Sequence, residues 1–337
     1  MKRYLGVDLH RRQFVVCTRL EDGKSWLRQW AMEALPQWVE QLQAEDEIAV
    51  EATSGTARFY EAVVGKVRRV VVVNPHQFKV ISESAKKTDC RDAEALALYL
   101  SKDLLPEVRM KPQKHRELAH LAETRDLLVK QRSALKSKIN NLLAMQGIEL
   151  KREGLSSQVA LQRVLRVEAS AGVKIELRVL VEQIRSLNAS IRELEDLIEE
   201  EGEPLPGHKN LTSIKGIGTL SATVLLTTIG EIRDFADENK LAAYLGLVPR
   251  VQNSNESQRS GHITKMGNKL ARTALVQCGL VAKRYSPYLQ NFYERVKQRR
   301  GGGKAKIALA RKLVKIVYDT LKNDWVFQDF PSFTLAA

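Results

Sequence analysis

The sequence predicts an α/β domain at the N-terminus, then long paired helices, then a helical C-terminal domain. Three observations support this prediction. Short apolar runs alternate with helical patterns over residues 1–105, and leucine or isoleucine recurs every seven residues within 114–200. Beyond these heptads, helical segments are joined by turns that contain glycine. The predicted domains are residues 1–113, 114–203 and 204–337.

The N-terminal domain begins with three strands that are expected to pair in an antiparallel manner. Tyr4–Asp8 and Gln13–Arg19 are joined by a basic turn, and the hairpin signal Asp22-Gly23 leads to a third strand at Ser25–Trp30. Helices and parallel strands are then expected to alternate, at Leu35–Gln43, Ile48–Ala52, Thr56–Lys66, Arg69–Val73 and after Asp89. This is the element order of an RNase H-like fold.

Four carboxylates stand at the ends of these predicted elements. Asp8 and Glu51 each end an apolar run, and Asp89 and Asp92 lie three residues apart where a helix begins. Strand-end carboxylates of this kind would converge at one edge of the sheet. Mg²⁺ prefers oxygen ligands, and two such ions about 4 Å apart need several carboxylates. The pattern indicates metal-dependent phosphodiester chemistry on nucleic acid, although each acid alone is also what a turn or a helix cap uses.

The heptads predict a coiled coil or a long helical hairpin. One set comprises Leu118, Leu121, Leu128, Leu135, Ile139 and Leu142, and the second comprises Leu177, Leu180, Ile184, Leu187, Ile191, Leu194 and Ile198. The turn between them is expected within Gly147–Gly172, and an acidic linker at Glu199–Gly207. Self-association through these helices would give a homo-oligomer, a dimer or a tetramer. The alternative is two core helices of a bundle.

The helical C-terminal domain opens with two glycines around an apolar residue, Ile214-Lys215-Gly216-Ile217-Gly218, before a helix at Thr219–Thr228. This is the helix-hairpin-helix pattern, in which backbone N–H groups face a phosphate at the second helix. Lys215 is therefore a candidate nucleic-acid contact. A tight turn that binds nothing is the alternative.

The charge of the chain points to a polyanionic partner. The net charge is +14, and Val251–Lys322 holds 16 Lys and Arg residues against three acids. A folded segment this basic favours nucleic acid over a merely solvated face or an anionic lipid surface. The sequence has no membrane-span pattern and no secretory leader, and its three cysteines have no metal-ligand spacing. We therefore expect a cytoplasmic protein with reduced thiols.

A polar segment, Arg250–Asn268, separates the expected helices Asn239–Leu245 and Lys269–Arg284. It contains three serines, Ser254, Ser257 and Ser260. Three residues suited to activating a nucleophile or clamping a phosphate lie close to them in sequence: Arg259, His262 and Lys265. From chemistry alone, a solvated loop remains the more common explanation. Lys269 and Arg272 lie in the first turn of the next helix. This helix and Lys304–Lys322 are expected to contact a nucleic-acid backbone. Gly301–Gly303 is expected to be a hinge between the basic stretches.

At this point nearly the whole chain resembles the insertion-sequence transposases and recombinases that include the pilin-gene invertase. The N-terminal half matches at Gly6-Val7-Asp8, Val50–Gly55, Asn74-Pro75 and Lys87–Ala93. The C-terminal half matches at Ile214–Gly218, at Tyr244-Leu245-Gly246-Leu247-Val248-Pro249-Arg250, and from Ser254 to Asn268.

The resemblance implies a RuvC-like N-terminal domain whose Asp8, Glu51, Asp89 and Asp92 bind Mg²⁺. It also implies a C-terminal transposase domain in which Ser254 attacks DNA and holds a covalent phosphoserine. The chain has Asn255 where the family has glycine after this serine, and this leaves Ser257 as an alternative nucleophile. Family members recombine donor and target DNA under the guidance of a structured (bridge) RNA, so both nucleic acids are expected partners.

Two other functions fit parts of this pattern. One is a hydrolytic nuclease of the Holliday-junction type, which would use the same carboxylates and no serine. The other is a coiled-coil nucleic-acid-binding protein without activity, which the presence of all four acids disfavours.

Overall fold

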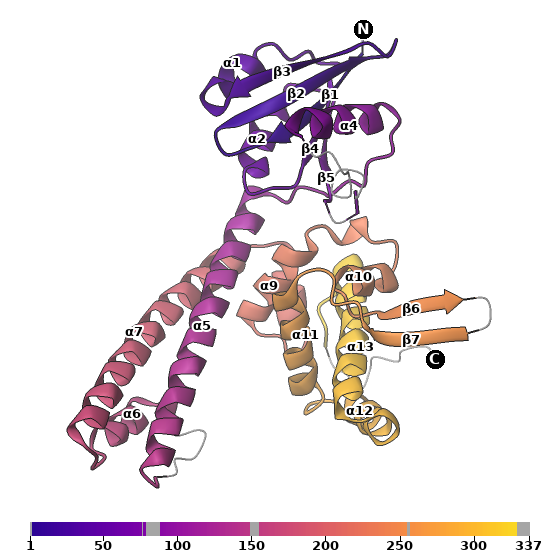
Figure 1. The fold of residues 1–337 in the computed structure, drawn as a ribbon. Coiled ribbons are helices and arrows are strands. Elements are labelled where there is room, and N and C mark those ends of the chain that lie inside the picture. Colours follow the sequence, from indigo (N-terminus) through magenta and orange to yellow (C-terminus); the bar gives the residue numbers. More distant parts are fainter. Residues whose placement is uncertain (1, 76, 79–87, 149–154, 255–256, 329–337) are drawn as a thin grey trace. The chain divides into compact units, whose positions relative to one another are not determined.

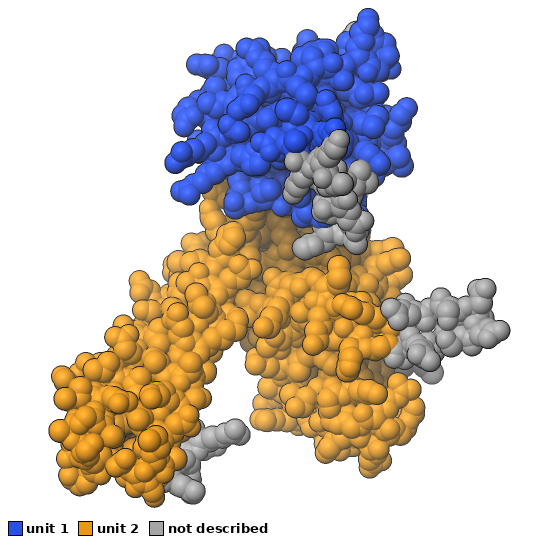
Figure 2. Space-filling view, viewed as in Figure 1, with its two compact units in different colours: residues 1–110 blue, residues 111–337 orange. Residues whose placement is uncertain are grey.

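The computed structural model describes residues 2–75, 77–78, 88–148, 155–254 and 257–328, with the backbone alone for the described part of 251–260. The chain forms two compact units, residues 1–110 and 111–337, which Figure 2 colours separately. In the described ranges, no helix combines the length and the apolar character that crossing a membrane would require. The division into three domains stays a prediction.

The first unit is built on a five-stranded mixed sheet in the order β3-β2-β1-β4-β5 (Figure 1). The antiparallel strands are β1 (Arg3–Leu9), β2 (Gln13–Leu20) and β3 (Ser25–Ala31), and β4 (Glu47–Glu51) and β5 (Arg69–Val73) continue parallel to β1. The predicted strands and their directions are confirmed. The first helix is shorter than the predicted Leu35–Gln43, since α1 (Leu35–Val39) ends at Val39, and a short 3-10 helix, η1 (Met32–Ala34), precedes it.

Alternate residues of β1, β4 and β5 belong to two different cores, because side chains point to opposite faces of a sheet. On one face, Leu5, Val7 and Leu9 pack with α1 and with α2 (Thr56–Val63), where the rings of Phe14 and Trp38 meet edge to face at 5.3 Å. On the other face lies α4 (Asp89–Ser101), whose Leu96 and Leu100 pack with residues of β4 and β5. Helices thus cover both faces of the sheet.

The second unit begins with two long helices that lie side by side, α5 (Gln113–Met145) and α7 (Ala171–Gly202) (Figure 1). They run antiparallel, since Arg125 pairs with Glu195 at 2.8 Å and, further along, Arg132 pairs with Asn188 at 2.8 Å. The segment between them contains a third helix that the sequence did not reveal, α6 (Gln158–Leu165). The heptads therefore form a helical hairpin within one chain, and α7 continues into the segment that was expected to be a linker.

The isoleucine row of α7 is the buried side of this hairpin. Ile184, Ile191 and Ile198 are at most 2% exposed, whereas the leucines of the other heptad row, Leu180, Leu187 and Leu194, are half-buried. The isoleucine row of α7 is therefore buried by packing within the same chain, against α5.

Ile184→Asp combined with Ile191→Asp is expected to lower the unfolding temperature sharply. Each substitution buries a charge without a partner, which costs several kcal/mol unless the carboxylate reaches water. Thermal melting would measure the loss, and light scattering would report any change of mass. The matched control is Val179→Asp on the same helix, because Val179 is 46% exposed. Equal melting temperatures for the double variant and this control would contradict the buried seam.

The remaining helices surround a core formed largely by α9 and α13 (Figure 1). In order, the elements are α8 (His208–Thr212), α9 (Thr219–Ile229), η3 (Ile232–Asp234), α10 (Glu238–Tyr244), β6 (Pro249–Ser254), β7 (Ser257–Ile263), α11 (Lys269–Ala282), α12 (Pro287–Arg300) and α13 (Gly302–Lys322). The expectation of an all-helical region with a solvated serine loop is wrong, because β6 and β7 form an antiparallel hairpin there. Its polar residues lack the apolar alternation that would have indicated strands.

Candidate functional site

The sheet register places Asp8 and Glu51 next to each other. The parallel pairing of β1 with β4 matches Val7 with Val50, so Asp8 and Glu51 are the next residues along the two strands. Val7 and Val50 face the α1 and α2 side, and the alternation of side chains therefore turns both carboxylates toward α4. This is the convergence at one sheet edge that the sequence predicted.

Gly6 allows α4 to lie directly on β1. A Cβ atom at this position would stand 2.1 Å from the carbonyl oxygen of Ala93 and 2.4 Å from the backbone nitrogen of Ala97. Ala93 and Ala97 are themselves small and fully buried. The three small residues set the helix close to the strand, and this close packing brings the start of α4 to Asp8.

Three side chains meet where β1 ends and α4 begins. The Nε2 atom of His10 lies 3.1 Å from Oδ2 of Asp8 and 3.2 Å from Oδ2 of Asp89. The ligand atoms of all three lie within 4.8 Å of one another, an arrangement suited to a divalent cation. The Asp8 side chain is 13% exposed and that of Asp89 is 46% exposed, so the cluster opens to solvent on the helix side.

From the sequence, His10 is placed only in the basic turn after the first strand, and its position between Asp8 and Asp89 is not predicted. A signal was present, because His10 follows Asp8 by two residues, and an extended chain returns to the same face at that spacing.

The other two predicted ligands lie on the same face but outside this cluster. Asp92 is buried, 7% exposed, one helical turn after Asp89, and Glu51 is half-buried at the end of β4. The alternative that Asp89 or Asp92 caps the helix is wrong. Thr88 is the N-cap, and its hydroxyl accepts a hydrogen bond from the Arg91 N–H. Acids in the first turn are in addition stabilised by the helix dipole.

Gly6→Ala is expected to destabilise the first unit and to displace the start of α4 from Asp8. The added methyl meets backbone atoms that cannot rotate away, and overpacking of this kind typically costs about 1–3 kcal/mol. Urea unfolding would measure the loss. Gly65→Ala is the matched control, because a Cβ at Gly65 has nothing within 4 Å. The close-packing argument fails if the two variants unfold at the same urea concentration.

Both candidate nucleophiles belong to the β6–β7 hairpin. Ser254 and Ser257 are Cα partners at the last pair of the ladder, and Arg259 pairs with Gln252. Paired residues lie about 5 Å apart across an antiparallel ladder, so the two serines are close in space as well as in sequence. Asn255, the departure from the family pattern, lies outside the described residues.

The segment after the hairpin is held against the end of α10. A Cβ on Gly246 would stand 2.1 Å from the Met266 carbonyl oxygen, and one on Gly267 would stand 2.1 Å from that of Tyr244. Both glycines have positive φ, +69° and +88°. Two motifs that are about twenty residues apart in the chain, Tyr244–Arg250 and Gly261–Asn268, thus pack against each other through their glycines.

Arg272 braces this junction. Its Nη1 atom donates to the carbonyl oxygens of Leu245 at 3.0 Å and Met266 at 3.3 Å, and partial burial lowers its pKa. This structural task was not foreseen when Arg272 was named as a nucleic-acid contact. His262, Lys265 and Lys269 are exposed around the same junction and stay predicted phosphate contacts.

One glycine of the predicted helix-hairpin-helix has a packing role. At Gly216, with φ +108°, a Cβ would stand 2.7 Å from the backbone nitrogen of Ala282 on α11. Gly218 caps α9 and has open space around it, and Lys215 is exposed. A phosphate at this turn stays a prediction.

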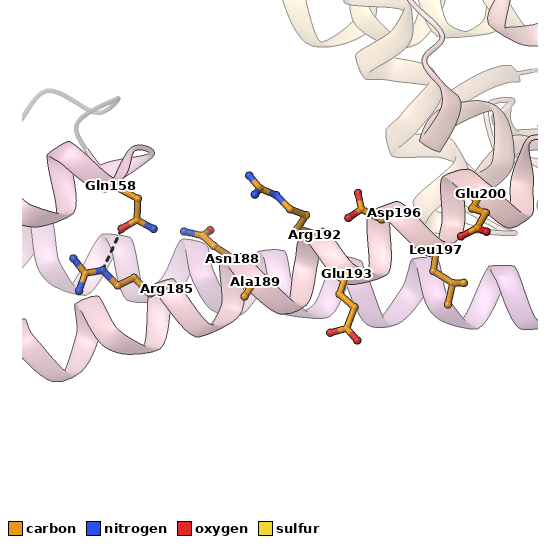
Figure 3. A pocket seen from close by; sticks show the side chains of 9 residues that line it. All are labelled: Gln158, Arg185, Asn188, Ala189, Arg192, Glu193, Asp196, Leu197 and Glu200. Carbon is orange, nitrogen blue, oxygen red and sulfur yellow. Dashed lines mark hydrogen bonds between the residues drawn. The ribbon is translucent and has the colours of Figure 1, made fainter.

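A separate groove of about 610 Å³ runs along the outer side of α7. Figure 3 shows its basic side chains, Arg185 and Arg192, followed along α7 by the acidic Glu193, Asp196 and Glu200, and the hydrogen bond of 3.2 Å from Arg185 to Gln158 of α6. None of the candidate catalytic residues lines it. Its mixed charge fits a solvated helix face better than a reaction site.

Two protein-family models match the chain. A transposase model with the Asp-Glu-Asp-Asp domain of IS110 matches residues 5–146, and the model of the IS116/IS110/IS902 transposase family matches residues 208–294. The first contains all four predicted carboxylates, and the second contains the serine hairpin. An Asp-Glu-Asp-Asp domain and the Asp8–His10–Asp89 cluster are together compatible with a divalent metal site.

Full-length relatives agree with these matches. A probable family 20 transposase of Pseudomonas aeruginosa is 27% identical to this chain, and the match covers 96% of this chain and 94% of the relative's sequence. The transposase of insertion sequence IS1111A from Coxiella burnetii is also 27% identical, over 97% and 91%. The pilin gene-inverting protein of Moraxella bovis is 25% identical, over 97% and 98%. The chain is therefore a DNA transposase or site-specific recombinase, and both of its halves are similar to transposases of the IS110/IS116 type.

Proposed function

We propose that this transposase cleaves and rejoins DNA with two groups of residues, a Mg²⁺-binding carboxylate set and a serine nucleophile. The observation that supports the proposal most directly is the meeting of Asp8 and Asp89 on the α4 face of the sheet. The names of the relatives, insertion-sequence transposases and a pilin gene-inverting protein, support donor and target DNA as its substrates.

The carboxylate set fits a hard divalent ion. Asp8 and Asp89 offer oxygen atoms, which are the ligands that Mg²⁺ prefers. Both carboxylates lie close to the same atom, Nε2 of His10, at 3.1 Å and 3.2 Å. We propose that Glu51 and Asp92 complete the set from the neighbouring strand end and the next helical turn, with room for two ions. When bound, Mg²⁺ polarises the scissile phosphate and stabilises negative charge on the departing oxygen. The frame is proposed to be RNase H-like and of the RuvC type.

Ser254 is the proposed nucleophile of the second group. Its hydroxyl oxygen forms a bond to phosphorus, the bond from phosphorus to the departing strand oxygen breaks, and that oxygen takes up a proton. The covalent phosphoserine conserves the energy of the phosphodiester for rejoining. Arg259, His262 and Lys265 follow the serine in the hairpin and the turn after it, and a positive environment is what a serine needs for activation.

Three further parts of the proposal come from the resemblance and from charge. A structured guide RNA pairs with donor and target DNA. The basic C-terminal helices contact the nucleic-acid backbone, and so do Lys215 and the turn before α9, which binds a phosphate. The protein acts as a homo-oligomer, a dimer or a tetramer, through its long helical hairpin.

Removing either the metal or the RNA is expected to stop recombination. Purified protein with its co-purifying RNA would be incubated with donor and target plasmids in Mg²⁺, in EDTA, and after ribonuclease treatment. Joined products should form only in the first reaction. Recombination that survives ribonuclease would overturn RNA guidance, and recombination in EDTA would overturn the metal. Cleaved products without joined ones would favour the hydrolytic nuclease.

A further inference from the structure

An exposed row of aromatic residues lies at the start of α12. Tyr285, in the turn before the helix, is 56% exposed, and Tyr288 is 39% exposed. Phe292 is half-buried one helical turn further on, on the same face as Tyr288. Arg295 and Arg299 continue that face toward the end of α12. Exposed tyrosines in such a row have no packing role that accounts for them.

Positive groups lie directly over these rings. The Nζ atom of Lys312, on α13, stands 4.9 Å from the ring centroids of both Tyr288 and Phe292. The guanidinium of Arg295 stands 6.0 Å from the Phe292 centroid. These are cation–π distances, so the rings hold the cations in place without neutralising them.

Few carboxylates oppose this charge. In the sequence of α12, Glu294 is the single acid, and it pairs with Lys297 at 3.3 Å. Across the described chain, no carboxylate forms an ion pair with Arg295, Arg299, Arg300, Lys304 or Lys306, and all five are exposed. The aromatic row therefore sits in a strongly positive and uncompensated field.

This combination distinguishes between possible partners. A DNA duplex would use the cations to bind its phosphates, but its bases are stacked on each other and offer no free face to a tyrosine ring. A protein partner would favour aliphatic side chains and mixed charge. Single-stranded nucleic acid needs both features, because its bases stack on aromatic rings while its phosphates contact the cations. Exposed tyrosines with unpaired arginines match that requirement.

We propose that the face formed by Tyr285, Tyr288, Phe292, Arg295, Arg299 and Lys312 binds a single-stranded segment of DNA or RNA by base stacking. The inference rests on the nucleic-acid function of the transposase and assigns a strand-specific site to it. It requires neither Ser254 nor the carboxylates.

The test uses the full-length protein after nuclease treatment, carrying Ser254→Ala, in EDTA. Fluorescence anisotropy would measure binding of labelled oligothymidine and oligouridine of about 12 nucleotides, and of a duplex. Tyr285→Ala with Tyr288→Ala should weaken single-strand binding about tenfold or more and leave duplex binding nearly unchanged. Tyr288→Phe, which keeps a ring, should bind as wild type does. Comparing the two oligonucleotides decides between DNA and RNA.

Salt dependence separates stacking from charge. The tyrosine variant should keep the wild-type slope of log affinity against log salt, whereas Arg295→Gln with Arg299→Gln should make it shallower by about 1.4. Trp26→Ala is the matched control, because Trp26 is 49% exposed on β3 in the other unit. The proposal is overturned if the tyrosine variant binds single strands as wild type does, or if it loses duplex and single-strand binding equally. A Tyr288→Phe variant that binds single strands as weakly as the double alanine variant would also overturn it.

Because metal and Ser254 are absent from this test, its failure leaves the proposed reaction untouched. Recombination that persists in Asp8→Asn or in Ser254→Ala, with oligonucleotide binding intact, would instead count against the proposed reaction.

Discussion

Asp8→Asn is expected to abolish strand cleavage while nucleic-acid binding persists. The amide keeps the shape of the side chain but removes the negative charge at the centre of the cluster, where Asp8 contacts His10. Loss of a direct ligand should exceed the 10–100-fold effects that are typical of outer-shell partners, so activity should fall by more than about a hundredfold. A cleavage assay in Mg²⁺ would measure activity, and calorimetric titration with Mn²⁺ would measure metal binding.

Asp22→Asn is the matched control for this experiment. Asp22 lies in the β2–β3 turn, where asparagine is as suitable as aspartate, and its side chain is 38% exposed. This variant should cleave and bind metal as wild type does. Normal cleavage by Asp8→Asn would show that the carboxylates of this face do not hold the catalytic ion.

Ser254→Ala is expected to eliminate the covalent protein–DNA adduct completely. Alanine has no oxygen with which to form the phosphoester, whereas the hairpin, the carboxylate cluster and the basic helices keep all their atoms. RNA binding and oligomer size should be unchanged. The reaction would be stopped with denaturant, and labelled DNA that migrates with protein would be quantified.

Ser257→Ala is the natural control, since the two serines face each other across one ladder pair. It should retain adduct. The opposite pattern, with adduct lost only in Ser257→Ala, would move the nucleophile across the hairpin. Wild-type protein that cleaves without ever forming an adduct would contradict serine chemistry and leave the hydrolytic alternative.

The sheet and its carboxylates were predictable because their signals are local. Apolar runs such as Ile48–Val50 have strand length, and the change of connection from tight turns to helices indicates the change from antiparallel to parallel pairing. Asp8 and Glu51 follow directly, since the ends of neighbouring parallel strands must meet. Asp89 is brought to them by Gly6, and a glycine in a strand indicates only that some backbone comes close, without saying which.

Other features depend on contacts that leave no periodic trace. The sequences of β6 and β7 are mostly polar, so these strands resemble a loop in sequence. Arg272 resembles any other basic residue of a phosphate-binding helix, and only the tertiary fold shows that its guanidinium bonds to backbone carbonyls. The heptads predicted paired helices but left open whether the partner helix was in the same chain.

The position of β1 in its sheet has a consequence for how the protein is made. β1 is synthesised before the other strands of its sheet, yet it is the middle strand of five, and its second neighbour β4 and its covering helix α4 are synthesised much later. The early β1–β2–β3 hairpins form from local contacts, but the rest must wait for long-range closure. Asp8 therefore has no Asp89 beside it until α4 has emerged, and the proposed metal site of a nascent chain is incomplete before that moment.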